Sequence, residues 1–201
     1  MKIKLYTFVA FFAGISLIAC EKNQQLLDDQ NLKPNAPVST KKADNSISPD
    51  KVIVPGESPC PVTVTQLTAG QFINAGSVTV TNDENYIYVM YTTANGYVLT
   101  LTHLYVGNCA NIPLNNQGNP VPGRFPYKAT HANLTTYTYQ VPISAISAGS
   151  CGCIAAHAAV VKLDEAGNIV DSQTAWGSGY RINPQGNWGM AFGYCSCAPG
   201  L

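Results

Sequence analysis

Short segments in which apolar and polar residues alternate recur along the chain from about residue 63, and each is bounded by glycine, proline, asparagine or aspartate. This period of two is that of a β-strand, whose successive side chains point to opposite faces. No segment keeps a sustained helical spacing of apolar residues, and no internal repeat is visible. The pattern predicts strands at 63–67, 77–82, 86–93, 97–106, 135–141, 154–163, 169–176 and 188–195.

These strands predict an all-β domain over residues 56–201, an antiparallel β-sandwich of about eight strands with jelly-roll or immunoglobulin-like topology. The dipeptide Asn95-Gly96 is the strongest hairpin signal in the chain. The segments Thr81–Asn85 and Asp164–Asn168 are two further tight turns.

The strand at 97–106 carries apolar residues on both of its expected faces, which is typical of a central strand covered on one side and partly on the other. Alternation places five of its residues on one face: Tyr97, Leu99, Leu101, His103 and Tyr105. A loop from Gly107 to Lys128 follows, and it is longer than an ordinary connection. Such a loop either serves a function or covers one end of the sandwich.

The first residues predict export. Two lysines, Lys2 and Lys4, precede an apolar run that ends at Ala19 and is too short to span a bilayer comfortably. This arrangement predicts a signal peptide over residues 1–19. The residues Leu17-Ile18-Ala19-Cys20 resemble the lipobox of bacterial lipoproteins, which implies that Cys20 is acylated. An ordinary cysteine at the end of an uncleaved anchor is the alternative.

Residues 20–55 would then comprise the lipidated cysteine and a flexible tether. The segment after Cys20 has no aromatic residue and is rich in Asn, Lys, Asp, Ser and Pro, so it cannot bury enough apolar surface to fold. We therefore expect a protein of the cell envelope, lipid-anchored to a membrane and facing the periplasm or the cell surface.

Six cysteines follow Cys20: Cys60, Cys109, Cys151, Cys153, Cys195 and Cys197. An even number in an exported domain predicts disulfides. The two C-x-C doublets could face each other on antiparallel strands, or Cys60 or Cys109 could join one member of each doublet. A thiolate metal site with His157 nearby is the alternative, which the missing C-x-x-C spacing disfavours.

Charge and motifs argue against several functions. The formal net charge is +0 at pH 7 and 11% of the residues are charged, so no basic stripe invites nucleic acid. No hydrolase, metalloprotease or phosphate-binding motif occurs, and we expect no metal and no other cofactor. Asp171 with His103 or His157 could form part of a triad, but no nucleophile has a supporting context.

Binding is easier to support. The chain has 11 tyrosines and two tryptophans, whose flat amphipathic rings suit sugars or protein partners. Trp176 and Trp188 bracket a polar loop that contains Arg181, although both tryptophans could instead be core residues. The candidate binding residues are His103, Arg124, Tyr127, His157, Trp176, Arg181 and Trp188.

Four stretches together resemble an extracellular domain family found in many secreted proteins and lipoproteins, notably of Bacteroidetes. They are "VLTLTHLYVG" (98–107), "GNPVPGRFPYK" (118–128), "IAAHAAVVKLDEAGNIVDSQTAWG" (154–177) and "GNWGMAFGYCSC" (186–197). The family pattern has acidic residues where this chain has Leu101 and Gln173. If those acids form a shared ion or ligand site, the resemblance implies that this member lacks it.

Together these features predict a membrane-tethered, non-catalytic binding or adhesion module for glycans or neighbouring envelope proteins. A secreted hydrolase using His103 or His157 is one alternative. A purely structural envelope protein is another.

Overall fold

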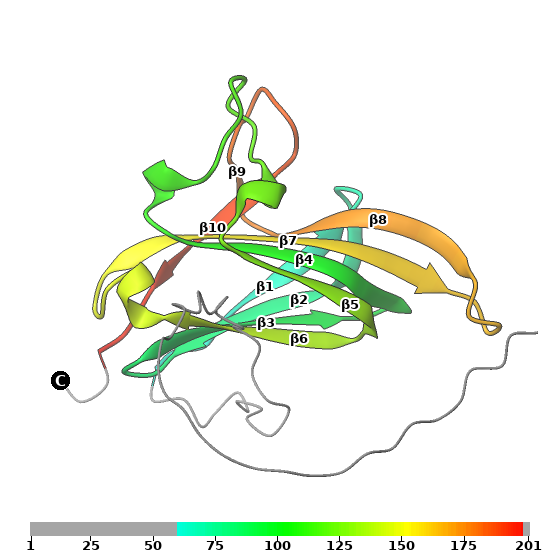
Figure 1. Ribbon diagram of the computed structural model, residues 1–201, viewed down its shortest axis with the longest axis horizontal. Coiled ribbons are helices and arrows are strands. Elements are labelled where there is room, and N and C mark those ends of the chain that lie inside the picture. The colour runs from blue at the N-terminus through cyan, green and yellow to red at the C-terminus, as the bar shows by residue number, and fades with distance from the viewer. Residues whose placement is uncertain (1–59, 199–201) are drawn as a thin grey trace, which may run out of the picture. The chain divides into compact units, whose positions relative to one another are not determined.

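The computed structural model describes residues 60–198 (Figure 1). The predicted signal peptide, Cys20 and the tether lie outside the described residues. Within residues 60–198 the helices are single 3-10 turns: η1 (Cys109–Asn111), η2 (Pro122–Arg124) and η3 (Ile143–Ala145). None of these turns has the length or the apolar character that crossing a bilayer requires.

The domain is all-β, as predicted, and every strand pairing in it is antiparallel. Its strands are β1 (Thr63–Ala69), β2 (Ile73–Asn82), β3 (Tyr86–Thr93), β4 (Tyr97–Gly107), β5 (Tyr127–Leu134), β6 (Thr136–Pro142), β7 (Cys151–Leu163), β8 (Ile169–Gly177), β9 (Tyr180–Arg181) and β10 (Met190–Cys195). Their order in the sheet is β5-β4-β7-β8-β1-β2-β3-β6, and β10 pairs with both β7 and β9.

The sheet bends back on itself into two layers (Figure 1). One layer contains β5, β4, β7 and β8, and the other contains β1, β2, β3 and β6. The layers are joined where β1 pairs with β8 over three residues of each strand. At the opposite side, the Thr102 hydroxyl of β4 lies 2.7 Å from the Tyr139 hydroxyl of β6. The result is a sandwich that is nearly closed into a barrel.

The main core fills the space between the layers. Its largest fully buried side chains include Tyr91, Tyr139, Leu99, Leu104 and Ile154. β-Branched and aromatic residues suit this pleated, half-buried surface, which is why the alternating segments form strands here. β7 is buried on both faces over Cys153–Ala158, because a second cluster of apolar side chains covers its outer face.

A bulge in β4 corrects the predicted alternation. The pairing of β4 with both neighbours shifts register between Leu99 and Leu101, so Thr100 is the extra residue. A bulge moves every later side chain to the other face. Tyr97 therefore packs in the main core, whereas His103 and Tyr105, predicted on the same face as Tyr97, lie on the outer face.

Two of the three predicted hairpin turns are confirmed, and the one at Asn95-Gly96 is wrong. The turns after β2 and after β7 join strands that pair with each other. Asn95 and Gly96 do adopt positive φ angles of 56° and 81°. However, β3 pairs with β2 and β6, and β4 pairs with β5 and β7, so this turn carries the chain from one layer to the other.

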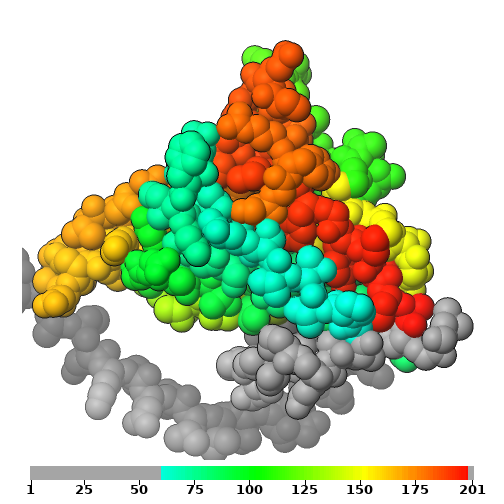
Figure 2. Space-filling model, turned by 180° about the vertical axis from the view of Figure 1, so that it is seen from behind, coloured from blue at the N-terminus to red at the C-terminus, as the bar shows by residue number. Residues whose placement is uncertain are grey.

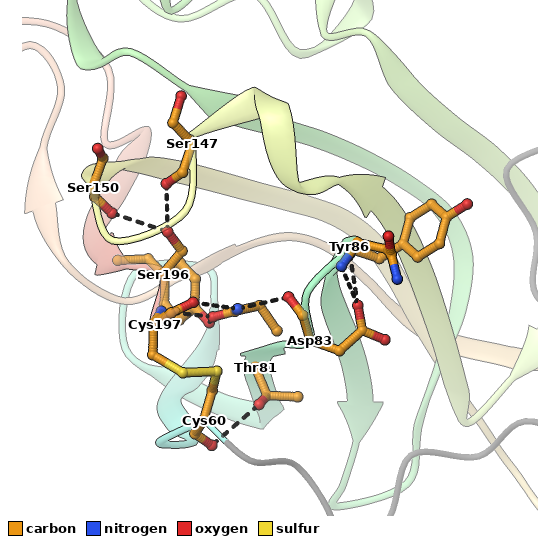
Figure 3. Close-up of a disulfide and its surroundings, with 11 residues drawn as sticks. Cys60, Thr81, Asp83, Tyr86, Ser147, Ser150, Ser196 and Cys197 are labelled. Carbon is orange, nitrogen blue, oxygen red and sulfur yellow. Dashed lines mark hydrogen bonds between the residues drawn. A yellow bond between two sulfur atoms is a disulfide. The ribbon is translucent and has the colours of Figure 1, made fainter. Parts of the chain in front are cut away.

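Three disulfides join the cysteines, which confirms the predicted stapling. Cys151 pairs with Cys195 directly across β7 and β10. The other member of each doublet joins a single cysteine, in the pairs Cys109–Cys153 and Cys60–Cys197. Both arrangements that the sequence left open therefore occur together. Figure 3 shows the Cys60–Cys197 bond, which links the two ends of the described domain.

Candidate functional site

Two segments rise side by side from the outer face of the β4–β7–β8 layer (Figure 1). They are residues 108–126, between β4 and β5, and residues 178–189, between β8 and β10. We call these two segments the crest. Figure 2 shows the crest from behind, as an apex of orange atoms from the second segment with green atoms of the first behind them. The long loop predicted from the sequence is thus one half of a projection.

The base of the crest packs onto the sheet through a second apolar cluster. Phe125 is 1% exposed and its ring lies 6.3 Å from that of Trp176 on β8. Ile112 and Ala191 are buried in the same cluster. The Cys109–Cys153 disulfide ties the start of the first segment to β7. This base is therefore fixed by both packing and a covalent bond.

Asparagine side chains join the two segments near the apex. Asn183 Nδ2 donates to the Gln117 carbonyl at 2.8 Å and to Asn119 Oδ1 at 3.2 Å. The backbone amide of Asn187 donates to the same Asn119 oxygen at 2.8 Å. Asn115 shapes the tip, because its Oδ1 accepts from the amides of Gln117 and Asn119. The crest is held as one unit by these bonds.

The crest contains no carboxylate. Its charged residues are Arg124 and Arg181, and every Asp and Glu of residues 60–198 lies elsewhere in the domain. Arg181 Nη2 donates to Gln71 Oε1 on the β1–β2 turn at 3.2 Å. Exposed amides supply most of the remaining polar groups, at Asn116, Gln185 and Asn187 among others. The formal charge of the crest is therefore positive, which favours neutral or anionic ligands over cations.

A pair of histidines lies on the same outer face. His103 of β4 is directly opposite His157 of β7, and their Nδ1 atoms are 3.2 Å apart, so one ring donates a hydrogen bond to the other. The rings are stacked with an interplanar angle of 28°. His157 also meets Trp176 edge to face, and Lys128 of β5 is the cross-strand neighbour of His103.

Burial keeps both rings neutral. It lowers the pKa of His157 to about 4, with a smaller contribution from His103. Burial also lowers the pKa of His103, and the Lys128 ammonium adds to this effect. Both imidazoles are therefore neutral at pH 7, and each has a lone pair on one ring nitrogen. The pair can accept hydrogen bonds or coordinate an ion, but it cannot supply a positive charge at pH 7.

The catalytic arrangement considered for Asp171 does not form. Asp171 accepts hydrogen bonds from the Tyr97 hydroxyl at 2.6 Å and from Gln173 at 2.8 Å. The Tyr97 hydrogen bond holds the pKa of this carboxyl below its usual range. On β8, Asp171 is the cross-strand partner of Lys162, whereas the partner of His157 is Trp176, five residues further along β8. A carboxylate at that position cannot orient His157.

The thiolate metal site is also excluded, since all six cysteines are in disulfides. Within residues 60–198 no three His, Cys, Asp or Glu side chains are grouped as metal ligands.

Leu101 and Gln173, the two positions where the resembling sequence pattern has acidic residues, are not adjacent in this fold. Leu101 is opposite Ala159 on the outer face of β7, whereas Gln173 is opposite Val160 of the main core. The two positions are on opposite faces.

The structure brings together some of the predicted binding residues and separates others. His103 and His157 are in contact, and Arg124, Arg181 and the half-buried Trp188 belong to the crest. Trp176 is 4% exposed and serves the cluster under the crest, so its ring is a core residue. Tyr127 is half-buried and packs against Tyr139 on the inner side of the sheet, away from the crest.

The residues that the sequence reasoning missed are the amides of the crest, above all Asn119, Asn183 and Asn187. The sequence feature that could have identified them is the high content of Asn and Gln in two loops far apart in the chain. Comparison of the chain with protein-family models, with curated proteins and with solved structures returns no match.

Proposed function

We propose that this protein is a bacterial lipoprotein, anchored to a membrane through acylated Cys20, that presents a non-catalytic binding module for glycans. The observation that carries the proposal is the crest, a projection in which two loops are joined by amide hydrogen bonds and carry exposed amides outward. A binding surface that is already ordered loses little conformational entropy when a ligand arrives.

The chemistry of the crest suits carbohydrate. Each exposed amide, such as those of Asn116 and Gln185, offers both donors and an acceptor, which matches the hydroxyl groups of a sugar. The half-exposed Tyr180 ring adds a flat amphipathic surface to the second segment of the crest. With two guanidinium groups and no carboxylate, the crest favours neutral or acidic glycans.

The test is a glycan array probed with the purified protein. Asn116→Ala combined with Gln185→Ala should reduce binding without altering the unfolding temperature, because both side chains are exposed. Asn85→Ala is the matched control, an exposed amide on the β2–β3 turn, and should leave binding unchanged. Binding that survives the double variant would place the glycan elsewhere, and an empty array would refute the proposal. Turnover of an arrayed glycan that depends on His103 would favour the hydrolase alternative.

The anchor has its own test. Cys20→Ser should release the protein from the membrane fraction and abolish labelling by a fatty-acid analogue, because the thiol that carries the lipid is gone. Mass spectrometry of the wild-type protein should find residue 20 acylated at the N-terminus. An unacylated mature chain would contradict this part of the proposal while leaving glycan binding open to its separate test.

A further inference from the structure

The two histidines of the outer face have the spacing of metal ligands. Zinc and similar ions bind imidazole nitrogen at about 2.0–2.1 Å, so two ligands at a tetrahedral angle lie about 3.3 Å apart. The Nδ1 atoms of His103 and His157 are 3.2 Å apart. Direct cross-strand pairing of β4 with β7 sets this distance, and neither strand has to move to keep it.

We propose that His103 and His157 together chelate one divalent transition-metal ion through their Nδ1 atoms. Imidazole is a preferred ligand of zinc, copper and nickel, with copper the strongest binder of the series. No third His, Cys, Asp or Glu within residues 60–198 joins this pair. Water or the oxygen atoms of a second ligand would fill the remaining coordination positions.

The protons balance without a further reactant. In the hydrogen-bonded pair one ring carries its proton on Nδ1 and the other accepts it. Binding requires the donor ring to move that proton to its Nε2 atom, which frees both Nδ1 lone pairs. Both imidazoles stay neutral and no net proton is released at pH 7.

The residues around the histidine pair determine how exposed its rings are and place one positive charge near them. His103 is half-buried and is the more exposed of the two rings, whereas His157 is 9% exposed and contacts Trp176. Lys128, opposite His103, repels a cation, and its ammonium is drawn toward the Gly123 carbonyl by a hydrogen bond of 3.0 Å. Removing the charge of Lys128 should therefore strengthen metal binding, whereas removing a histidine should weaken it.

The experiment titrates the whole purified protein with copper(II) and with zinc(II) chloride, measured by calorimetry at pH 7. All proteins carry Cys20→Ser, so that no thiol competes. His103→Ala should weaken binding by about tenfold or more, because one of two ligands is lost. His131→Ala is the matched control, a half-buried histidine bonded to Thr102, and should bind as tightly as the parent protein. Lys128→Gln should tighten binding severalfold.

The His103→Ala variant alone can test the proposal if His157→Ala does not fold. The His103 ring is the more exposed of the two, so its removal should disturb the fold less. Failure of the parent protein to bind either ion at 1:1 stoichiometry would overturn the proposal. So would an affinity that His103→Ala leaves unchanged, or one that His131→Ala reduces equally.

Discussion

Asn82 shows how much a single buried amide contributes to this domain. Its side chain is 1% exposed. Its Oδ1 accepts from the Tyr194 hydroxyl at 2.8 Å and from the Cys197 amide at 3.0 Å, and its Nδ2 donates to the Cys197 carbonyl at 2.9 Å. One residue of β2 thus ties down both β10 and Cys197, which forms the disulfide shown in Figure 3.

We expect Asn82→Ala to lower the free energy of unfolding by about 2–3 kcal/mol, because it leaves the buried Tyr194 hydroxyl without its acceptor. Urea denaturation would measure the loss. Asn85→Ala, an exposed amide three residues along the chain, should change stability by less than about 0.5 kcal/mol. Equal losses of stability from the two substitutions would show that the buried hydrogen bonds of Asn82 do not stabilise the domain.

Gly76 and Gly193 form a second contrast at the residue scale. Gly76 has a φ of +142°, and a methyl group there would overlap the carbonyl oxygen of Thr92 on β3. Gly193 has no atom within 4 Å of the same position. Gly76→Ala should therefore cost about 3 kcal/mol or more, and Gly193→Ala should be neutral or slightly stabilising. Thermal unfolding of both variants tests this, and a tolerant Gly76→Ala would contradict the close packing of β2 on β3.

At the scale of elements, one substitution should loosen the crest and leave the sheet unchanged. Asn119→Ala removes the oxygen that accepts from both Asn183 and Asn187. We expect faster amide hydrogen exchange in residues 183–189, unchanged protection in β7, and a loss of about 1–2 kcal/mol in global stability at most. Asn116→Ala is the control in the same segment. Unchanged exchange in residues 183–189 would mean that these bonds do not hold the crest together.

The strands could largely be predicted from the sequence because alternation is a local property. All eight predicted strands exist, with ends that differ by a few residues. β5 was missed because Tyr127–Leu134 is mostly exposed at the end of the sheet and carries little apolar alternation. β9 is only two residues long. Neither strand buries enough apolar surface to leave a pattern.

Strand partners and faces were less predictable, because they depend on distant residues. Asn95 and Gly96 form the tight turn that their types favour, yet the strands that they connect belong to different layers. Nothing near Thr100 marks the bulge that turns His103 outward. The His103–His157 contact follows from that bulge together with the β4–β7 register. The candidate residues could be named from the sequence, but their grouping could not.

For the whole molecule, acid should be destabilising. The pKa of His157 is lowered to about 4 in the folded domain, mainly by burial, against about 6.5 in an unfolded chain. Since the unfolded chain takes up the proton first, the free energy of unfolding falls as the pH drops from about 6.5 to 4, by up to about 3 kcal/mol for this residue. His103 and His131, whose pKa values burial also lowers, act in the same direction.

Urea midpoints at pH 7 and pH 4.5 measure this loss. His157→Phe removes the titrating group and should flatten the profile between these values. The carboxyls of Asp164 and Asp171 have lowered pKa values, so their contribution is lost only below this range. Equal midpoints at the two pH values would contradict the burial of the imidazoles.

The three disulfides should not contribute equally. Cys60–Cys197 spans 137 residues and Cys151–Cys195 spans 44. If a disulfide acts by restricting the unfolded chain, removing the longer link as a double serine variant costs about 1 kcal/mol more than removing the shorter one. Calorimetric unfolding of the two double variants measures which loses more stability. A larger loss for the Cys151–Cys195 variant would show that effects of the disulfides on the folded state outweigh those on the unfolded chain.

The Cys60–Cys197 bond also governs how the domain bears mechanical load. A pull on the chain ahead of residue 60 passes through this bond to the end of β10 as well as into β1. The load is therefore shared between the two ends of the domain and does not fall on β1 alone. If the protein is anchored through Cys20 and binds a ligand at its crest, as we propose, this disulfide keeps the two ends of the domain joined under that load.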